Sequence, residues 1–298
     1  MSLLSAAHGI TSTILSNIFI HLPYPNANLR GQTIIVTGSN TGLGFEASRH
    51  LVRLGVDKLI MGVRDMQKGE VARREILHSE QRDESSIEVW PLDMDNYCSV
   101  KEFASRASQL PLLNAVLANA GICTAIYSVT EDNEKTITIN VISTFLLTLL
   151  LLPKLRQSAE QSGIAPRIVI PNSAMHYWAP VKELNVDGEI LAYMNDQKTA
   201  DMAGRYPVSK LLVIYVVREL ADRLRTSKKP LVIINTPNPS YCKSQLLRDP
   251  GVSSSFGMKA AEKLLARNTE VGSRALVHGI LSGPESHGHY LTNCHIQT

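Results

Sequence analysis

Short apolar runs rich in β-branched residues alternate along the chain with longer segments whose apolar residues recur at helical spacing. The runs predict strands at residues 33–37, 58–63, 87–92, 115–118, 167–171 and 231–235. The longer segments predict helices at 44–54, 68–78, 99–109, 133–156, 207–225 and 260–265. Strands and helices that alternate in this way form βαβ units, which place the strands in a parallel sheet buried on both faces. The pattern therefore predicts an α/β fold with a doubly wound sheet, helices on both faces, and ligands bound beyond the carboxyl ends of the strands.

Two stretches fall outside this alternation. Residues 1–30 contain an apolar run at 10–20 with no Lys or Arg before it, so a secretory signal is not expected. We expect a helical extension that packs on the body or on a second subunit, with interfacial membrane contact as the alternative, and a linker at Pro23 and Pro25. Residues 31–298 are expected to form a single domain. Within it, segments 177–205 and 240–258 are expected to cover the substrate, although 177–205 could instead be a long surface excursion.

Composition narrows the classes of partner. The chain has 298 residues, of which 44% are hydrophobic, enough for the full core of one domain. The net charge is only +3, and the 30 Lys and Arg are spread along the chain, so no nucleic acid partner is expected and the substrate is expected to be a small molecule. The longest apolar stretches, 141–152 and 211–217, are shorter than the roughly 18 residues of a transmembrane span.

The four cysteines lie far apart and form no Cys-x-x-Cys pair. This spacing argues against a disulfide framework and against a zinc site, so no metal is expected. The cysteines are expected to be reduced thiols of an intracellular, cytoplasmic protein.

A glycine-rich turn follows the first predicted strand directly and opens a helix, which is the context of a phosphate-binding turn. Residues 37–44 read TGSNTGLG. Gly38 permits the tight turn, Gly42 lets the backbone approach a pyrophosphate, and Gly44 lets the helix pack closely on the strand. Such a turn could also be a plain loop, but its position after the first strand favours nucleotide binding.

The residues after the second and third strands bear on the choice of cofactor. Arg64 follows the second strand, where a guanidinium can pair with the 2′-phosphate of NADP, so NADP is preferred. Asp65 beside it could instead serve NAD, and Arg64 could be a solvated turn residue. Asp93, after the third strand, could accept a hydrogen bond from the adenine amino group or cap the helix that begins near Ser99.

Tyr206 and Lys210 are four residues apart and therefore lie on one face of a helix. A lysine cation near a phenol favours the phenolate, which brings the phenol closer to the working pH of a general acid or base. Pro207 suits the first turn of this helix. Taken alone, the pair could be an ordinary surface pair.

Together these motifs resemble the short-chain dehydrogenase/reductase superfamily over about residues 30–292. Residues 37–44 are similar to its glycine-rich turn, Asn119-Ala120-Gly121 to its Asn-Ala-Gly motif, and Tyr206 with Lys210 to its Tyr-x-x-x-Lys pair. Finer features resemble retinol-dehydrogenase-like enzymes and fungal biosynthetic reductases. The resemblance implies a single-domain Rossmann-type sheet of about seven strands.

The resemblance also implies roles for individual residues. Ser173 would hydrogen-bond the substrate oxygen, the Asn140 backbone would support a water relay to Lys210, and Lys210 would also hold the nicotinamide ribose hydroxyls. The expected cofactor-binding residues are Gly38, Asn40, Thr41, Gly42, Leu43, Gly44, Arg64, Asp93, Asn119, Ala120, Gly121, Tyr206, Lys210, Pro239 and Ser244.

Two positions depart from the family pattern. Pro239-Ser240 stands where the family has Pro-Gly, so a side chain occupies a position suited to glycine. Asn172 precedes Ser173 where a second serine is usual. His176, which follows soon after, could line the substrate pocket, but a structural hydrogen bond is the preferred interpretation.

The predicted activity is NADPH-dependent interconversion of a ketone or aldehyde and an alcohol, on an apolar or secondary-metabolite substrate, with NAD as a possible cofactor. Hydride would move between nicotinamide C4 and the substrate carbon, Tyr206 would transfer the proton, and Ser173 would polarise the oxygen. A non-redox isomerisation, dehydration or cyclisation on the same fold is the alternative, and a nucleotide-sensing protein is a third possibility. The long apolar helices 133–156 and 207–225 favour a homodimer, with a tetramer or an N-terminal cover over these faces as alternatives.

Overall fold

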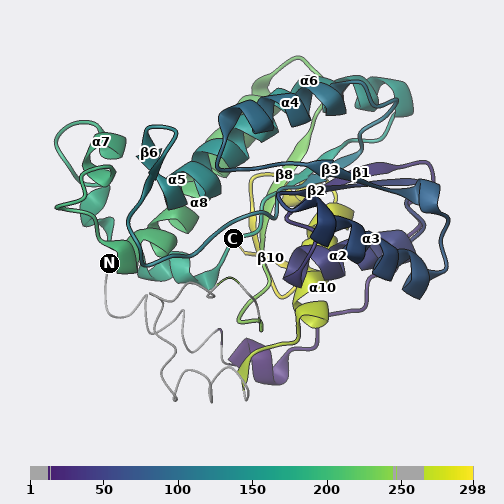
Figure 1. Cartoon of the computed structure of the whole chain (residues 1–298), viewed down its shortest axis with the longest axis horizontal. Helices are drawn as coiled ribbons and strands as arrows, with labels where there is room; N and C mark the ends of the chain where they lie inside the picture. The colour runs from purple at the N-terminus through teal and green to yellow at the C-terminus, as the bar shows by residue number, and fades with distance from the viewer. Residues whose placement is uncertain (1–12, 14, 244–245, 247–264, 298) are drawn as a thin grey trace.

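Figure 1 presents a computed structural model of the chain, which describes residues 13, 15–243, 246 and 265–297. Eight strands form one sheet in the order β10-β9-β8-β7-β4-β1-β2-β3. Every neighbouring pair is parallel except β9 with β10. The strands are β1 (Thr33–Thr37), β2 (Lys58–Val63), β3 (Ile87–Pro91), β4 (Ala115–Leu117), β7 (Arg167–Val169), β8 (Ile233–Asn238), β9 (Tyr290–Thr292) and β10 (His295–Gln297). The predicted doubly wound α/β fold is confirmed, with one strand more than the predicted seven.

Strands β9 and β10 were not predicted from the apolar runs. Each has only three residues, which is too short for a periodic signal. Asn293 and Cys294 connect them with φ angles of 51° and 61°, the left-handed conformation of a tight hairpin turn. β9 pairs with β8 in parallel, so this hairpin completes the edge of the sheet.

Helices cover both faces of the sheet, with α4 and α6 on one side and α2, α3 and α10 on the other (Figure 1). Their bounds are α2 (Gly42–Arg53), α3 (Met66–Glu80), α4 (Tyr97–Ser108), α5 (Lys135–Ile137), α6 (Thr144–Ser162), α7 (Ile190–Met194), α8 (Met202–Thr226) and α10 (Thr269–Leu281). A π-helical turn at Thr138–Ser143 joins α5 to α6, and a small hairpin, β5 (Val129–Thr130) and β6 (Asn133–Glu134), precedes them. The predicted helix at 260–265 lies, apart from its last residue, outside the described residues.

Helix α10 was missed by the hydrophobic pattern because two glycines, Gly272 and Gly279, interrupt it. In the structure these glycines permit close packing. A Cβ on Gly279 would lie 2.9 Å from side-chain atoms of both Asn235 and Val169. The same absence of side chains that weakens the helical signal therefore lets the helix approach the sheet.

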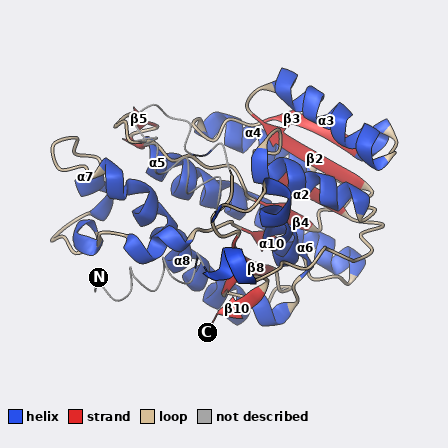
Figure 2. Cartoon of the chain, turned by 90° about the horizontal axis from the view of Figure 1, so that it is seen from below, coloured by secondary structure: helices blue, strands red, loops and turns tan. Residues whose placement is uncertain are grey.

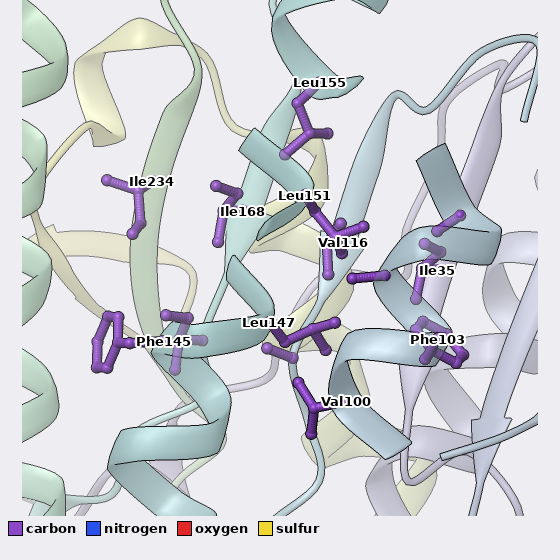
Figure 3. Packing of buried hydrophobic residues seen from close by; sticks show 14 of the residues in the cluster. Ile35, Val100, Phe103, Val116, Phe145, Leu147, Leu151, Leu155, Ile168 and Ile234 are labelled. Carbon is purple, nitrogen blue, oxygen red and sulfur yellow. The ribbon is translucent and has the colours of Figure 1, made fainter. Parts of the chain in front are cut away.

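The alternation within each strand divides the core into two layers. Ile35, Ile60, Val116, Ile168 and Ile234 point to the face that packs against α4, α6 and α8, as Figure 3 shows for most of them. Their sequence neighbours on the strands, among them Ile34, Leu59 and Val169, pack on the opposite side with residues of α2 and α10. Both faces of the sheet are buried, as its continuous apolar strands predicted.

The continuous helical run Lys135–Ser162 is long and apolar enough to cross a membrane, by length and composition alone. However, 67% of its most apolar window is buried inside the protein, where Leu147, Leu151 and Leu155 belong to the core (Figure 3). Such burial is typical of the core helix of a globular domain. No other helix among the described residues meets these criteria.

Residues of the N-terminal segment are anchored to the body of the same chain. Residues 15–19 are helical, and the Asn17 amide donates to the carbonyls of Tyr241 (2.7 Å) and Leu265 (2.8 Å). The Arg267 guanidinium donates to the carbonyls of Ser16 (2.7 Å) and Ile20 (3.1 Å). This part of the segment therefore packs beside the two ends of the excursion that leaves the sheet after β8.

Candidate active site

A cleft of about 1060 Å³ lies along the carboxyl ends of the central strands. The glycine turn after β1, the loop after β4, the segment after β7 and the start of α8 all contribute to it. The cleft brings together predicted site residues from distant parts of the sequence: Gly38, Asn40, Thr41, Gly42, Leu43, Arg64, Asp93, Asn119, Ala120, Gly121, Ser173, Tyr206, Lys210 and Pro239. Gly44 and Asn140 lie just behind its wall, and Ser244 lies outside the described residues.

The glycine turn is held in shape by the Asn-Ala-Gly segment after β4. The Asn119 amide donates to the carbonyls of Thr37 (3.0 Å) and Gly38 (3.2 Å), and the Thr37 hydroxyl accepts from the Ala120 amide at 2.9 Å. The Asn119 side chain therefore links the segment after β4 to the end of β1. A Cβ on Gly44 would collide with this same Asn119 amide, which explains why the position requires glycine.

Gly42 occupies the left-handed region with φ of 61°, and no atom lies within 4 Å of the place where its Cβ would be. This space opens into the cleft at the amino end of α2, where helical N–H groups favour an anion. A nicotinamide dinucleotide fits such a site, because its pyrophosphate can lie against backbone that carries no side chain.

Asp65, the residue beside Arg64 that could instead serve NAD, is engaged in contacts with its own helix. The Asp65 carboxylate caps α3 by accepting from the Lys68 amide (3.1 Å) and pairs with the Lys68 ammonium (3.1 Å). Arg64 is exposed at the rim of the cleft. The Asp93 carboxylate accepts from the Asp95 amide at 3.0 Å, whereas α4 is capped by Asn96, so Asp93 does not cap that helix.

Tyr206 and Lys210 lie on α8 and both face the cleft. The helix begins at Met202, because Asp201 caps it by accepting from the Gly204 amide. Pro207 therefore lies in the second turn rather than in the first, and that prediction was wrong. The helix begins before the predicted start because its capping residue, Asp201, lies near the end of the 177–205 segment.

The Tyr206 phenol is 6% exposed and hydrogen-bonds the Ser173 hydroxyl. Burial raises the pKa of Tyr206, and Cys123 adds to this effect, while the Ser173 hydrogen bond lowers it. Burial also lowers the pKa of Lys210, to about 8. The Lys210 ammonium donates to the Pro171 carbonyl at 2.8 Å and lies 5.6 Å from the centre of the Tyr206 ring. Burial is thus the largest influence on the pKa of Tyr206 and raises it, contrary to the expectation of a lowered phenol pKa.

Asn140 lies in the π-helical turn and is 3% exposed. Its amide group accepts from the Ile122 amide (2.9 Å) and donates to the Ile122 carbonyl (2.9 Å) and the Ser209 hydroxyl (3.1 Å). The side chain therefore fixes the loop after β4 to the helix that carries Tyr206. π-Helical turns are rare and occur frequently at functional sites.

Asn172 and Ser240, the two departures from the family pattern, both affect the local structure. The Asn172 amide donates to the Lys210 carbonyl and the Thr236 hydroxyl (3.2 Å each), and its oxygen accepts from the Ser173 amide at 2.7 Å. Asn172 therefore connects the backbone of Ser173 to helix α8. Ser240 adopts φ of 66°, the left-handed conformation that favours glycine, and its amide donates to the Asn238 side chain at 2.9 Å.

His176 is buried and its ring lies 2.7 Å from the Ser173 carbonyl. It does not appear among the cleft residues of the described chain. Burial lowers the pKa of His176, so a neutral ring that makes a structural hydrogen bond agrees with the preferred interpretation.

The cleft also contains residues that the sequence did not indicate. Apolar side chains line its walls: Leu92, Met94, Ile122, Ile139, Met175 and Leu246. Leu246 falls in the segment 240–258 that was expected to cover the substrate. The others carry no signal that distinguishes them from core residues, so only the fold reveals them. By contrast, within the described part of the chain no residue of 177–205 lines the cleft. No group of three or more His, Cys, Asp or Glu in the described part of the chain could hold a metal ion.

Comparison with known proteins agrees with the geometry. The family model described as short chain dehydrogenase matches residues 32–174. The chain is 44% identical over 289 residues to the short chain dehydrogenase/reductase dmxR8 of Cryptosporiopsis, covering 96% of this chain and 88% of the relative. It is 42% identical to the short chain dehydrogenase atnD of Emericella nidulans, covering 94% of this chain and 90% of the relative.

Solved structures share the fold at lower identity. A short chain dehydrogenase from Escherichia coli complexed with NADPH superposes with a TM-score of 0.65 at 21% identity, covering 90% of this chain and 97% of the other.

Proposed function

Because the chain belongs to the short-chain dehydrogenase/reductase family, we propose that this oxidoreductase uses NADPH to reduce a ketone or aldehyde to an alcohol, or catalyses the reverse oxidation. One observation carries the proposal: Ser173, Tyr206 and Lys210 meet in the same cleft as the glycine turn. NADPH, when bound, supplies the hydride. Its pyrophosphate would lie against Gly42 and the amino end of α2, and the exposed Arg64 would pair with the 2′-phosphate.

Two hydroxyls are available to the substrate oxygen. Ser173 polarises that oxygen, and Tyr206 gives it a proton. Since the pKa of Tyr206 is raised, the phenol is protonated at neutral pH and is competent as a general acid for reduction. The phenolate that remains is stabilised by the Lys210 ammonium, and the Asn140 backbone supports the path by which the proton is replaced.

The substrate is proposed to be a small apolar molecule, such as an intermediate of secondary metabolism. Apolar side chains line the same cleft as the two hydroxyls, among them Ile122, Met175 and Leu246. Tyr241 and Cys242 extend this wall at the start of the 240–258 segment. We propose that this segment borders the substrate, and that the enzyme acts as a cytoplasmic homodimer.

The decisive experiment incubates the purified chain with NADPH and a panel of apolar ketones and aldehydes, following NADPH absorbance and identifying products. We expect an alcohol product and loss of NADPH. Tyr206→Phe should lower kcat by about 10²- to 10⁴-fold because it removes the acid. The matched control is Tyr215→Phe, on the same helix at a half-exposed position, which should retain full activity. Full activity in Tyr206→Phe would refute the assignment, and a rearranged product without NADPH loss would indicate non-redox chemistry.

A further inference from the structure

Arg205 directly precedes Tyr206, and its side chain is completely shielded from solvent. Its Nη1 lies 2.9 Å from the Glu183 carboxylate and its Nε 3.4 Å from the Glu134 carboxylate. Its Nη2 donates to the Met194 carbonyl at 3.1 Å. Both carboxylates are also completely buried. One guanidinium therefore joins three segments that are separate in the sequence.

Each residue that contacts Arg205 lies at the end of a helix or is hydrogen-bonded to one. Glu134 caps α5 by accepting from its second and third amides, at 2.8 and 3.2 Å, and that helix continues into the turn that holds Asn140. The second oxygen of Glu183 accepts from the amide of Asp201, the residue that caps α8. Met194 is the last residue of α7. Figure 2 shows α5, α7 and the start of α8 gathered at one end of the molecule.

The rest of the 177–205 segment adds contacts to the first turn of α8. A Cβ on Gly204 would collide with the ring of Pro180, so this ring packs directly against the backbone of α8. The Lys182 ammonium pairs with the Asp201 carboxylate at 3.7 Å. The segment thus packs against the catalytic helix, whereas within the described residues it contributes nothing to the walls of the cleft.

A buried triad of this kind is poorly explained by stability alone. Removing charges from water is costly, and apolar side chains of similar volume can stabilise a core equally well. What a guanidinium adds is a planar fork of donors, which here hydrogen-bonds the Glu183 carboxylate and the Met194 carbonyl in fixed directions. Such directional contacts suit a place where orientation has to be exact, and the next residue along the chain is Tyr206.

We infer that Arg205 is a positioning residue for Tyr206, and that the 177–205 segment serves to buttress the catalytic helix. The triad fixes the rotation of the first turns of α8 relative to the Asn140 turn, and so holds the phenol at Ser173. This inference rests on the proposed role of Tyr206. A displacement of about 1 Å at a reacting group can cost about 100-fold in rate.

The test compares Arg205→Met, Arg205→Lys and Glu183→Gln with Arg223→Met, which removes an arginine of the same helix that is 75% exposed. Steady-state kinetics with NADPH and the best substrate give kcat, KM and the pH profile. Hydrogen exchange measures protection at Met202–Lys210 and across 181–194. Glu183→Gln keeps the volume and most hydrogen bonds, so it provides a folded variant if Arg205→Met is unstable.

We expect Arg205→Met to lower kcat by at least about 30-fold with KM for NADPH within about twofold, because the triad does not touch the cofactor turn. Arg205→Lys should recover part of kcat, and Glu183→Gln should fall between wild type and Arg205→Met. The high-pH limb of the profile should move in Arg205→Met. Protection should fall in both monitored segments, and Arg223→Met should match wild type throughout.

Unchanged kcat and protection in Arg205→Met would overturn the inference. So would an equal loss of kcat, NADPH affinity and protection along the whole chain, since that result means general destabilisation. If wild type turned over no carbonyl, the proposed function would fail by itself. Hydrogen exchange would then decide whether Arg205 orders the first turns of α8. Loss of protection confined to the two segments would support this role, and unchanged protection would refute it.

Discussion

At the residue scale, Ser240 is the position where a side chain conflicts most clearly with the backbone. Its φ of 66° costs a non-glycine residue roughly 1 kcal/mol. Ser240→Gly should therefore raise the free energy of unfolding by about 0.5–1 kcal/mol and the Tm by about 2 °C. Thermal unfolding measures this. Ser240→Ala, which keeps the Cβ and loses only the hydroxyl, is the matched control and should bring no gain; an equal gain in both would contradict the strain explanation.

For the proposed reduction, we expect Lys210 to set the pH dependence. Its pKa is lowered to about 8, so its ammonium is present below that pH and lost above it, while the phenol of Tyr206 stays protonated because its own pKa is raised. We expect kcat for reduction to be constant below pH 8 and to fall above it. In Lys210→Arg the guanidinium stays charged, so any remaining activity should lack this limb. If kcat of Lys210→Arg still fell above pH 8 as in the wild type, the fall would belong to another group.

We expect Arg64 to favour NADPH over NADH. Replacement by Ser removes the cation directly after β2 at the rim of the cleft, and should reduce kcat/KM for NADPH by about 10-fold or more. The value for NADH should change by less than about threefold. Lys58→Ser, which removes a cation at the opposite end of β2, controls for net charge. Equal losses with both cofactors would exclude a contact to the 2′-phosphate.

At the element scale, the N-terminal helical turn packs beside the start of the 240–258 segment, which we propose to border the substrate. Asn17 connects the residues that enter and leave the excursion after β8, where the Tyr241 and Cys242 positions also line the cleft. Asn17→Ala should raise the KM of the carbonyl substrate by about 3- to 10-fold and lower the Tm by about 2–4 °C. Asn28→Ala, which removes only a local contact to the Arg30 amide, should leave both values unchanged. Identical kinetics in the two variants would show that the turn serves only stability.

At the scale of the whole molecule, α6 and α8 present apolar residues that the described part of the chain leaves exposed. Leu149 is 51% exposed, Leu150 40% and Tyr215 50%. If these helices pair two subunits, light scattering of the wild type should give twice the 32.8 kDa of the chain. Leu150→Glu should shift the mass toward the monomer, because a dimer would bury this charge. Ile164→Glu, just beyond α6, should stay dimeric, and a monomeric wild type would refute the proposal.

The sequence predicted most of the sheet because long apolar strands, helical spacing and the glycine turn are all local signals. Six strands and five helices correspond to predicted segments, with boundaries that differ by a few residues. The tertiary structure was needed for α10, whose glycines interrupt the helical spacing of its apolar residues. It was also needed for β9 and β10, which are too short to show a periodic pattern. The start of α8 was misplaced because its cap depends on where the 177–205 segment ends.

The chain order therefore determined the fold class, since parallel strands bring their carboxyl ends to one edge, and the family resemblance added Ser173 and Asn140 to the candidate site. Only the tertiary structure decided what holds those residues in place. Asn119 braces the glycine turn, Asn172 positions Ser173, and Arg205 joins Glu134 and Glu183 beside Tyr206. These contacts connect residues far apart in the sequence, and no local pattern encodes which distant partner a buried polar group meets.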